Sequence, residues 1–181
     1  MGDHDSIDLG GMRLPRGPVA ELRLERAHGS SDPVAVTVIR DDRLAVQLQA
    51  FHASTAGEAA DARARFARNV RHRGGTAEER PGPGGTELIC VVPSVRPDGT
   101  PVDTPIRVLW KEAPGWLLRA VVSGPDQDPA PGGDGEDWAH AYVEHVVVDP
   151  SFRLPRLDPS PAAFGPPRPV GPIPLRHPAT G

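Results

Sequence analysis

The sequence predicts an α+β domain, a mostly antiparallel sheet of about six strands packed against helices, in the order hairpin, helix, meander, helix. Three observations lead to this fold class. Several short runs alternate apolar and polar residues and are separated by turn residues. One longer segment has apolar residues three and four positions apart, which is the helical spacing. From residue 150 onward the chain holds ten prolines, which exclude a helix or a central strand there.

The opening hairpin is expected from residues 33–40 and 43–52, joined by a turn at Asp41-Asp42. In the second of these runs, aliphatic side chains alternate with Gln47 and Gln49. A period of two places both glutamines on the opposite face from the aliphatic residues, toward water or a partner. Gln47 and Gln49 are therefore candidate partner-binding residues.

The strongest helical pattern covers residues 57–72, with Ser54 or Thr55 as its expected cap. Its apolar stripe consists of Ala59, Ala62, Phe66 and Val70. The stretch from Arg63 to Arg73 carries five arginines, so one alternative function is weak nucleic-acid binding through this helix. We disfavour it because this face lacks aromatic residues for base stacking and the net charge of the chain is −4.

The meander is expected from three strong strands at residues 87–95, 104–112 and 116–124, with a short strand at 76–80 before them. Residues 81–85 form a loop in this prediction, and a second helix follows at about 136–145. The hydrophobic core is expected to contain Val46, Leu48, Phe66, Val70, Leu88, Val91, Val108, Trp110, Leu118 and Val121.

No pattern of catalytic, cofactor-binding or metal-binding residues is found. Cys90 is the one cysteine and lies in an apolar run, which predicts a buried, inert thiol. The seven histidines are scattered over different elements, and His140 and His145 are too far apart in a helix to stack as ligands. The glycines at 82–85 fit neither a P-loop nor a dinucleotide fingerprint. We therefore assign no catalytic residue, cofactor or metal.

The chain is divided into one domain at residues 1–149 and a proline-rich tail at 150–181. We expect the first part of the tail, to about residue 158, to lie extended on the domain. We expect the remainder, from about residue 161, to be disordered in the isolated chain. It is either a passive tail or a partner-binding segment through Phe164, Ile173 and Leu175, because extended proline-rich strings lose little entropy on docking. The start of the sequence resembles no secretory signal, and we expect a cytoplasmic protein with no membrane span.

Several short strings occur together in a familiar order. They are residues 7–10 (IDLG), 13–15 (RLP), 44–51 (LAVQLQAF), 73–75 (RGG), 87–88 (EL), 92–93 (VP), 115–119 (GWLLR) and 146–148 (VVV). In this order and spacing the chain resembles the actinobacterial family catalogued as domain of unknown function 3710. It departs from the usual family strings at residues 52–54, 83–85 and 114–116, so it resembles a divergent member. The resemblance implies no activity, cofactor or site residue.

The leading functional hypothesis is a non-enzymatic protein-binding or adaptor domain, with a protein partner or a second copy of the chain. The alternative is a small enzyme or ligand-binding domain whose pocket is assembled from dispersed residues. A pocket where a histidine and carboxylates converge favours the enzyme. A filled core with a flat, exposed apolar patch favours the adaptor.

Overall fold

The computed structural model describes residues 6–9, 11–17, 19–26, 33–53, 55–128 and 137–149. The elements in these residues are β1 (Ser6–Asp8), β2 (Met12–Pro15), β3 (Glu21–Arg26), β4 (Pro33–Asp41), β5 (Leu44–His52), α1 (Glu58–His72), β6 (Thr76–Gly82), β7 (Gly85–Val95), β8 (Pro101–Ala113), β9 (Trp116–Ser123), α2 (Trp138–Glu144) and β10 (Val147–Val148). The tail at 150–181, with Phe164, Ile173 and Leu175, lies outside the described residues, so the predictions for it stay predictions.

The strands form two antiparallel sheets. The larger sheet has seven strands in the order β3-β4-β5-β9-β8-β7-β6, and the smaller has three in the order β1-β2-β10. The α+β class and the antiparallel pairing are confirmed, but one sheet of about six strands is wrong. The prediction missed β1, β2 and β3, which are short and are separated by glycines and prolines that mask their alternation.

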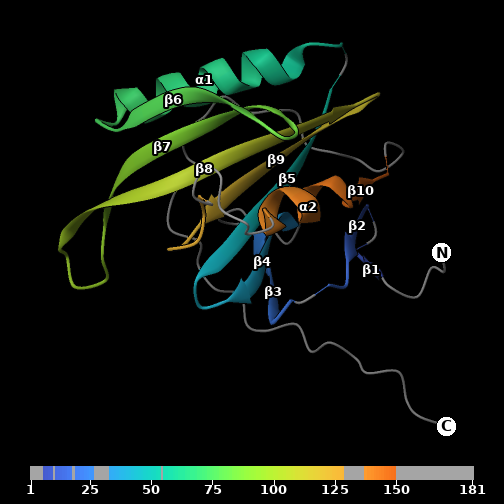
Figure 1. The fold of residues 1–181 in the computed structure, drawn as a ribbon, viewed down its shortest axis with the longest axis horizontal. Coiled ribbons are helices and arrows are strands. Elements are labelled where there is room, and N and C mark those ends of the chain that lie inside the picture. The colour runs from blue at the N-terminus through green and yellow to red at the C-terminus, as the bar shows by residue number, and fades with distance from the viewer. Residues whose placement is uncertain are drawn as a thin grey trace, which may run out of the picture.

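The two helices lie on opposite faces of the larger sheet (Figure 1). Helix α1 packs on β6, β7 and β8, against inward side chains such as Val108 and Trp110. Helix α2 packs in the same core cluster as Leu109, which lies between Val108 and Trp110 on β8. Successive side chains of a strand point to opposite faces, so α2 lies on the other face of β8. We call these two surfaces the α1 face and the α2 face. Each face of the sheet is covered by its helix over only part of its width.

Helix α1 begins and ends through backbone geometry. Its N-cap is Gly57, with φ of 92° and no side-chain cap, so the expected cap at Thr55 is wrong, and Ser54 lies outside the described residues. The Gly57 N–H donates to Oε1 of Glu112 on β8 at 2.8 Å, and the hydroxyl of Thr55 donates to Oε1 of Glu58 at 3.1 Å instead of capping the helix. The predicted apolar stripe is confirmed at Ala62, Phe66 and Val70, which are buried.

The turn between β6 and β7 is tighter than the sequence suggested. The residues expected to form a loop continue the ladder, because Pro81 pairs with Thr86 and Gly82 pairs with Gly85. A two-residue turn therefore joins the strands, and Gly85 supplies a φ of 115° that other residues rarely adopt. Proline is tolerated in β6 because this is an edge strand.

Most of the expected core is buried. The confirmed residues are Val46, Leu48, Phe66, Val70, Leu88, Val108, Trp110 and Leu118. Cys90 is also fully buried, and this burial raises the pKa of its thiol to about 11, as expected of an inert cysteine. Val121 is half-buried and packs against the core cluster under α1, whereas Val91 is half-buried and belongs to neither core cluster, so its assignment to the core is wrong. Val91 pairs with Pro105 on the α2 face, away from α1, and its neighbour Cys90 takes the inward position.

Candidate functional site

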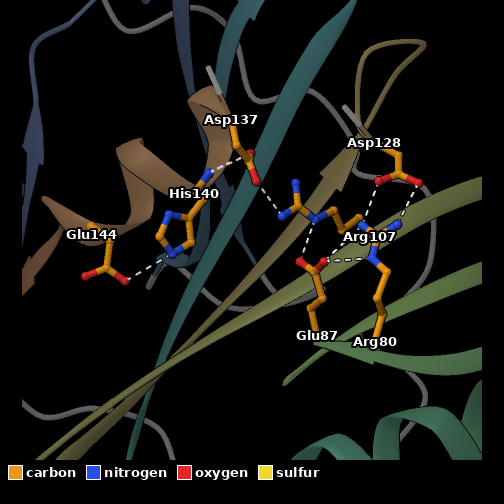
Figure 2. Close-up of polar contacts among 7 residues, drawn as sticks. All are labelled: Arg80, Glu87, Arg107, Asp128, Asp137, His140 and Glu144. Atoms are coloured by element: carbon orange, nitrogen blue, oxygen red, sulfur yellow. Dashed lines mark hydrogen bonds and ion pairs between the residues drawn. The ribbon is translucent and has the colours of Figure 1, made fainter. Parts of the chain in front are cut away.

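A buried arginine lies at the centre of a group of charged side chains on the α2 face (Figure 2). Arg107 on β8 is 1% exposed, and its Nε donates to Oε2 of Glu87 on β7 at 2.6 Å. Its Nη2 donates to Oδ2 of Asp137 at 2.5 Å. Two carboxylates from separate elements thus neutralise one buried guanidinium.

A second arginine extends this group toward the sheet edge. Arg80 on β6 donates from Nε to Glu87 at 2.9 Å, and it holds both oxygens of Asp128 at 2.6 and 3.1 Å. We call Arg80, Glu87, Arg107, Asp128 and Asp137 the arginine cluster. It joins the β6–β7 hairpin to β8, to the turn after β9 and to the start of α2.

Helix α2 is fixed at its N-terminal end by this cluster. Asp137 is the N-cap, and its Oδ1 accepts a hydrogen bond from the backbone N–H of His140 at 3.1 Å. The hairpin turn lies against the same helix, because a Cβ added to Gly84 would be 2.6 Å from Nε2 of His140. His140 also faces Glu144 one turn later, with 3.5 Å between Nε2 and Oε1.

A lysine fixes the other end of α2. Nζ of Lys111 on β8 donates to the carbonyl oxygens of Glu144 and Val146 at 2.6 and 3.1 Å. These carbonyls at the C-terminal end of the helix lack partners within it, so a cation satisfies both their hydrogen bonds and the helix dipole. Both ends of α2 are therefore attached to β8 by charged side chains.

Hydrogen bonds within the cluster stabilise the charged forms of Arg107 and Asp137. Burial opposes the charge of Arg107, but the hydrogen bonds that it donates to Asp137 and Glu87 outweigh this effect and raise its pKa. Burial likewise opposes the charge of Asp137, and the hydrogen bond from Arg107 outweighs it, so the pKa of Asp137 is lowered. All three carboxylates of the cluster accept from arginine, so each is held as an acceptor. The described residues contain no group of ligands suited to a metal ion.

The two candidate glutamines lie on the α1 face, away from the strands on which α1 packs. Nε2 of Gln47 donates to the carboxylate of Glu25, which also accepts from Thr37. Oε1 of Gln49 accepts from Arg119, its direct cross-strand neighbour. Both side chains are half-buried and form part of a polar surface over β3, β4 and β5.

Arg119 beside Gln49 is a buried cation that the sequence analysis did not single out. It is 7% exposed, and its guanidinium lies 5.3 Å from the ring centroid of Phe51 and 5.4 Å from that of Phe66. Burial lowers its pKa to about 10. The alternation of Leu117, Arg119 and Val121 carried a signal, because it places an arginine in an otherwise apolar row.

The arginines of α1 are partly engaged in the fold. Arg63 forms an ion pair with Glu79 on β6 at 3.1 Å, and Arg71 donates to the backbone oxygen of Ala77. Arg68 and Arg73 are exposed. Two of the five cations therefore fix α1 to the neighbouring strand, and the expectation that this helix does not bind nucleic acid stays a prediction.

The α2 face carries an apolar surface beyond α2. Along β7, every second residue from Ile89 points to this face, and β8 adds Pro105, the cross-strand neighbour of Val91. We call this surface the β7 strip, and its residues are Ile89, Val91, Pro93, Val95 and Pro105. Val95 is 65% exposed, and the two prolines are also exposed. In the part of the chain that the structure describes, the helix packed along β7 is α1, on the opposite face (Figure 1).

Two acidic residues border the β7 strip. Glu78 on β6 pairs in register with Ile89, and Asp103 on β8 pairs with Pro93. Cross-strand neighbours point to the same face, so both carboxylates flank the apolar side chains. Both are exposed, and neither forms an ion pair with another described residue.

A separate hollow of about 410 Å³ lies at the small sheet, lined by residues that include Asp8, Met12, Arg13, Val147 and Asp149. It is distant in sequence from both the glutamines and the β7 strip.

Neither helix among the described elements is long and apolar enough to cross a membrane.

Comparison with known proteins decides the family. A family model described as protein of unknown function (DUF3710) matches residues 1–152. The chain belongs to this family. The resemblance drawn from its short strings is thereby confirmed, and the DUF3710 match ends just after β10. No curated protein and no solved structure matches the chain.

Proposed function

We propose that this DUF3710 domain is a protein-binding module that recognises an extended segment of its partner through the β7 strip. The observation that carries the proposal is the strip itself. It is an apolar surface made by consecutive outward positions of one strand, on a domain whose core is already filled by both helices. Val95, Pro93 and Pro105 are exposed and Ile89 and Val91 are half-buried, and apolar surface that stays in contact with water commonly marks a binding site.

The border of the strip indicates the chemistry of the partner. Glu78 and Asp103 place negative charge on both flanks of the apolar residues. A partner segment that combines apolar side chains with arginine or lysine fits this pattern, because the charges then complement each other and steer the approach. Pro93 and Pro105 add flat, rigid contact area. The expected ligand is therefore a basic, apolar and extended peptide segment.

The arginine cluster favours a binding module over the alternative of an enzyme. His140 lies near carboxylates, which is the arrangement that an acid–base site requires. However, the cluster carboxylates are bonded to Arg80 and Arg107, and a side chain beyond glycine at position 84 would meet His140. These contacts indicate that the arginine cluster and His140 hold α2 and the β6–β7 hairpin in position.

The glutamine surface on the α1 face is the second candidate for the partner site. Gln47 and Gln49 lie on β5, and they hydrogen-bond to Glu25 and to Arg119, whose guanidinium lies against Phe66 of α1. A partner on this surface would be polar. It would compete with hydrogen bonds that these side chains already make to each other, which lowers the gain from binding.

The test compares the two surfaces directly. A photoreactive residue is placed at Val95 in one sample and at Gln47 in another, and proteins crosslinked in native cytosol are identified. The captured partner is then purified, and its affinity is measured by calorimetry for the parent chain, Val95→Asp, Glu78→Lys/Asp103→Lys and Gln47→Ala/Gln49→Ala. All substituted side chains are exposed or half-buried, so the variants are expected to fold, and circular dichroism checks that they do.

We expect the strip variants to weaken binding by at least about tenfold, which corresponds to about 1.4 kcal/mol, while the glutamine variant keeps the parent affinity. Loss of binding in the glutamine variant alone would move the site to the α1 face. Unchanged affinity in every variant would exclude both surfaces.

A further inference from the structure

The charge of the chain is divided unevenly between its domain and its tail. Residues 150–181 contain four arginines and one aspartate, a net charge of +3, so residues 1–149 carry −7 when the whole chain carries −4. The tail is thus a basic segment attached to an acidic domain. Such a pair attracts at moderate ionic strength.

The tail also has the apolar and conformational properties that the β7 strip favours. Its apolar residues are Phe152, Leu154, Leu157, Phe164, Val170, Ile173 and Leu175. The ten prolines between them bias the backbone toward extended conformations and remove backbone donors. An extended chain of this kind loses little conformational entropy when it docks.

The tail begins on the α2 face of the larger sheet, which is the face that carries the β7 strip. It follows β10, and the small sheet that contains β10 packs in the same core cluster as α2, on the α2 face. An extended chain advances about 3.1 Å per residue, so the tail can span roughly 100 Å. A domain of this size has a radius of gyration of about 15 Å. Every point of the α2 face is therefore within reach.

We propose that residues 150–181 are the segment that occupies the β7 strip when the protein is not bound to a partner. This inference rests on the proposed function, since it names an occupant of the same surface. The tail arginines pair with Glu78 and Asp103, and its apolar side chains cover Ile89, Val91 and Val95. Because the tail is tethered, its effective concentration at the strip is on the order of millimolar.

A tethered occupant has a regulatory consequence. An external partner then competes with the tail, and its apparent affinity is reduced by the fraction of time for which the strip is covered. Removal of residues 150–181 is expected to tighten partner binding by about tenfold if the strip is covered nine-tenths of the time.

The border charges argue for the tail over a second copy of the domain. Two strips packed face to face would bring the Glu78 and Asp103 side chains of both copies together, and like charges at an interface oppose association. The basic tail places opposite charges at the same positions. Docking within one chain is therefore the favoured arrangement.

The experiment uses paramagnetic relaxation in the full chain. Cys90 is fully buried, so a nitroxide attached to Ala163→Cys labels the tail alone. The label is expected to broaden the methyl signals of Ile89 and Val91 at least about threefold more than the reduced label does, while the side-chain amide signals of Gln47 and Gln49 stay sharp. The same label in a Glu78→Lys/Asp103→Lys background is expected to broaden them far less.

Three results would overturn the inference. One is equal intensity of the Ile89 and Val91 signals with the oxidised and the reduced label. Another is broadening that survives the charge reversal undiminished. The last is broadening that passes fully to an unlabelled, isotope-enriched chain mixed with the labelled one, because that result assigns the tail to a second copy.

Failure of this inference is distinguishable from failure of the proposed function. If the label leaves the strip unaffected while Val95→Asp still abolishes binding of the captured partner, the tail assignment alone is wrong. If Val95→Asp and the charge reversal leave partner binding intact, the strip is not the partner site, whatever the tail does.

Discussion

The guanidinium of Arg107 and the carboxylate of Asp137 meet at 2.5 Å, and this contact joins the centre of the sheet to the N-cap of α2. Thirty residues separate the two in sequence, counted from β8 to the start of the helix. Because Arg107 is almost fully buried, the pair has little help from water. The attachment of α2 therefore depends on charges that balance each other inside the protein.

Replacing Arg107 with alanine is expected to destabilise the domain by about 3–5 kcal/mol, because Asp137 loses its ion-pair partner and the buried Glu87 keeps only Arg80, at the edge of the cluster. Urea unfolding followed by circular dichroism measures this loss. The matched control is Arg43→Ala, which removes an exposed pair with Asp126 and is expected to cost at most about 1 kcal/mol. A similar loss of unfolding free energy in the two variants would mean that the buried ion pairs of Arg107 stabilise the domain no more than an exposed ion pair does.

The pH dependence of stability follows from the lowered pKa of Asp137. A carboxyl whose pKa is lower in the folded state stabilises the fold above its unfolded pKa, which for aspartate is about 3.9. That contribution is lost as the pH falls through the lower, folded pKa. We therefore expect the melting temperatures of the parent and of Asp137→Asn to differ most at neutral pH and to converge below about pH 4.

Thermal melts of both proteins between acid and neutral pH test this expectation. Other lowered carboxyls, such as Asp126, contribute to the slope of both curves, so the difference between the curves is the measured quantity. A constant difference across the whole range would contradict the assigned role of Asp137.

The contact between Gly84 and His140 makes a prediction about the hairpin turn. Gly84→Ala is expected to cost about 1–3 kcal/mol, because the added methyl would lie 2.6 Å from Nε2 of His140. His140→Ala in the same chain removes the obstacle, so the double variant is expected to recover most of that loss. Chemical denaturation of the four proteins gives the coupling energy. Additive losses would show that the turn and α2 do not touch.

The helix stripe is tested by Phe66, which is 4% exposed and packs edge-on against Trp110 with their ring centroids 6.2 Å apart. Phe66→Ala is expected to destabilise the domain by about 3–5 kcal/mol. Tryptophan fluorescence during urea unfolding reports the change. A loss below about 1 kcal/mol would mean that the ring is not part of the core.

Local patterns predicted the elements that the chain builds from adjacent residues. The alternation around Val46 and Leu48 located β5, and the spacing of Ala62, Phe66 and Val70 located α1. The small sheet was missed because β10 has two residues and pairs with β2, more than a hundred residues earlier. Short strands of that kind are stabilised by distant pairing, which local propensity does not report.

The sites were harder to predict than the elements. Alternation placed Gln47 and Gln49 on the polar face of β5, but it does not say how far a helix covers each face of a sheet. Val91 therefore looked like a core residue, although its face lies opposite α1. The pair of Glu87 and Arg107 arises from the register between β7 and β8, and register is set by the whole sheet.

The central claim is that the β7 strip binds the basic, apolar segment that this chain carries at its own end. The direct measurement is a calorimetric titration of a synthetic peptide with the sequence of residues 150–181 into the chain that ends at Asp149. That shortened chain keeps every buried residue of both core clusters, which lie between Leu14 and Val148. Circular dichroism verifies its fold before the titration.

We expect saturable binding that weakens as salt is added, is lost in Glu78→Lys/Asp103→Lys, and is retained in Gln47→Ala/Gln49→Ala. The physical reason is that the arginines of the peptide require the acidic border of the strip. A peptide that does not bind, or that binds the charge-reversed chain as tightly as the parent, would contradict the account.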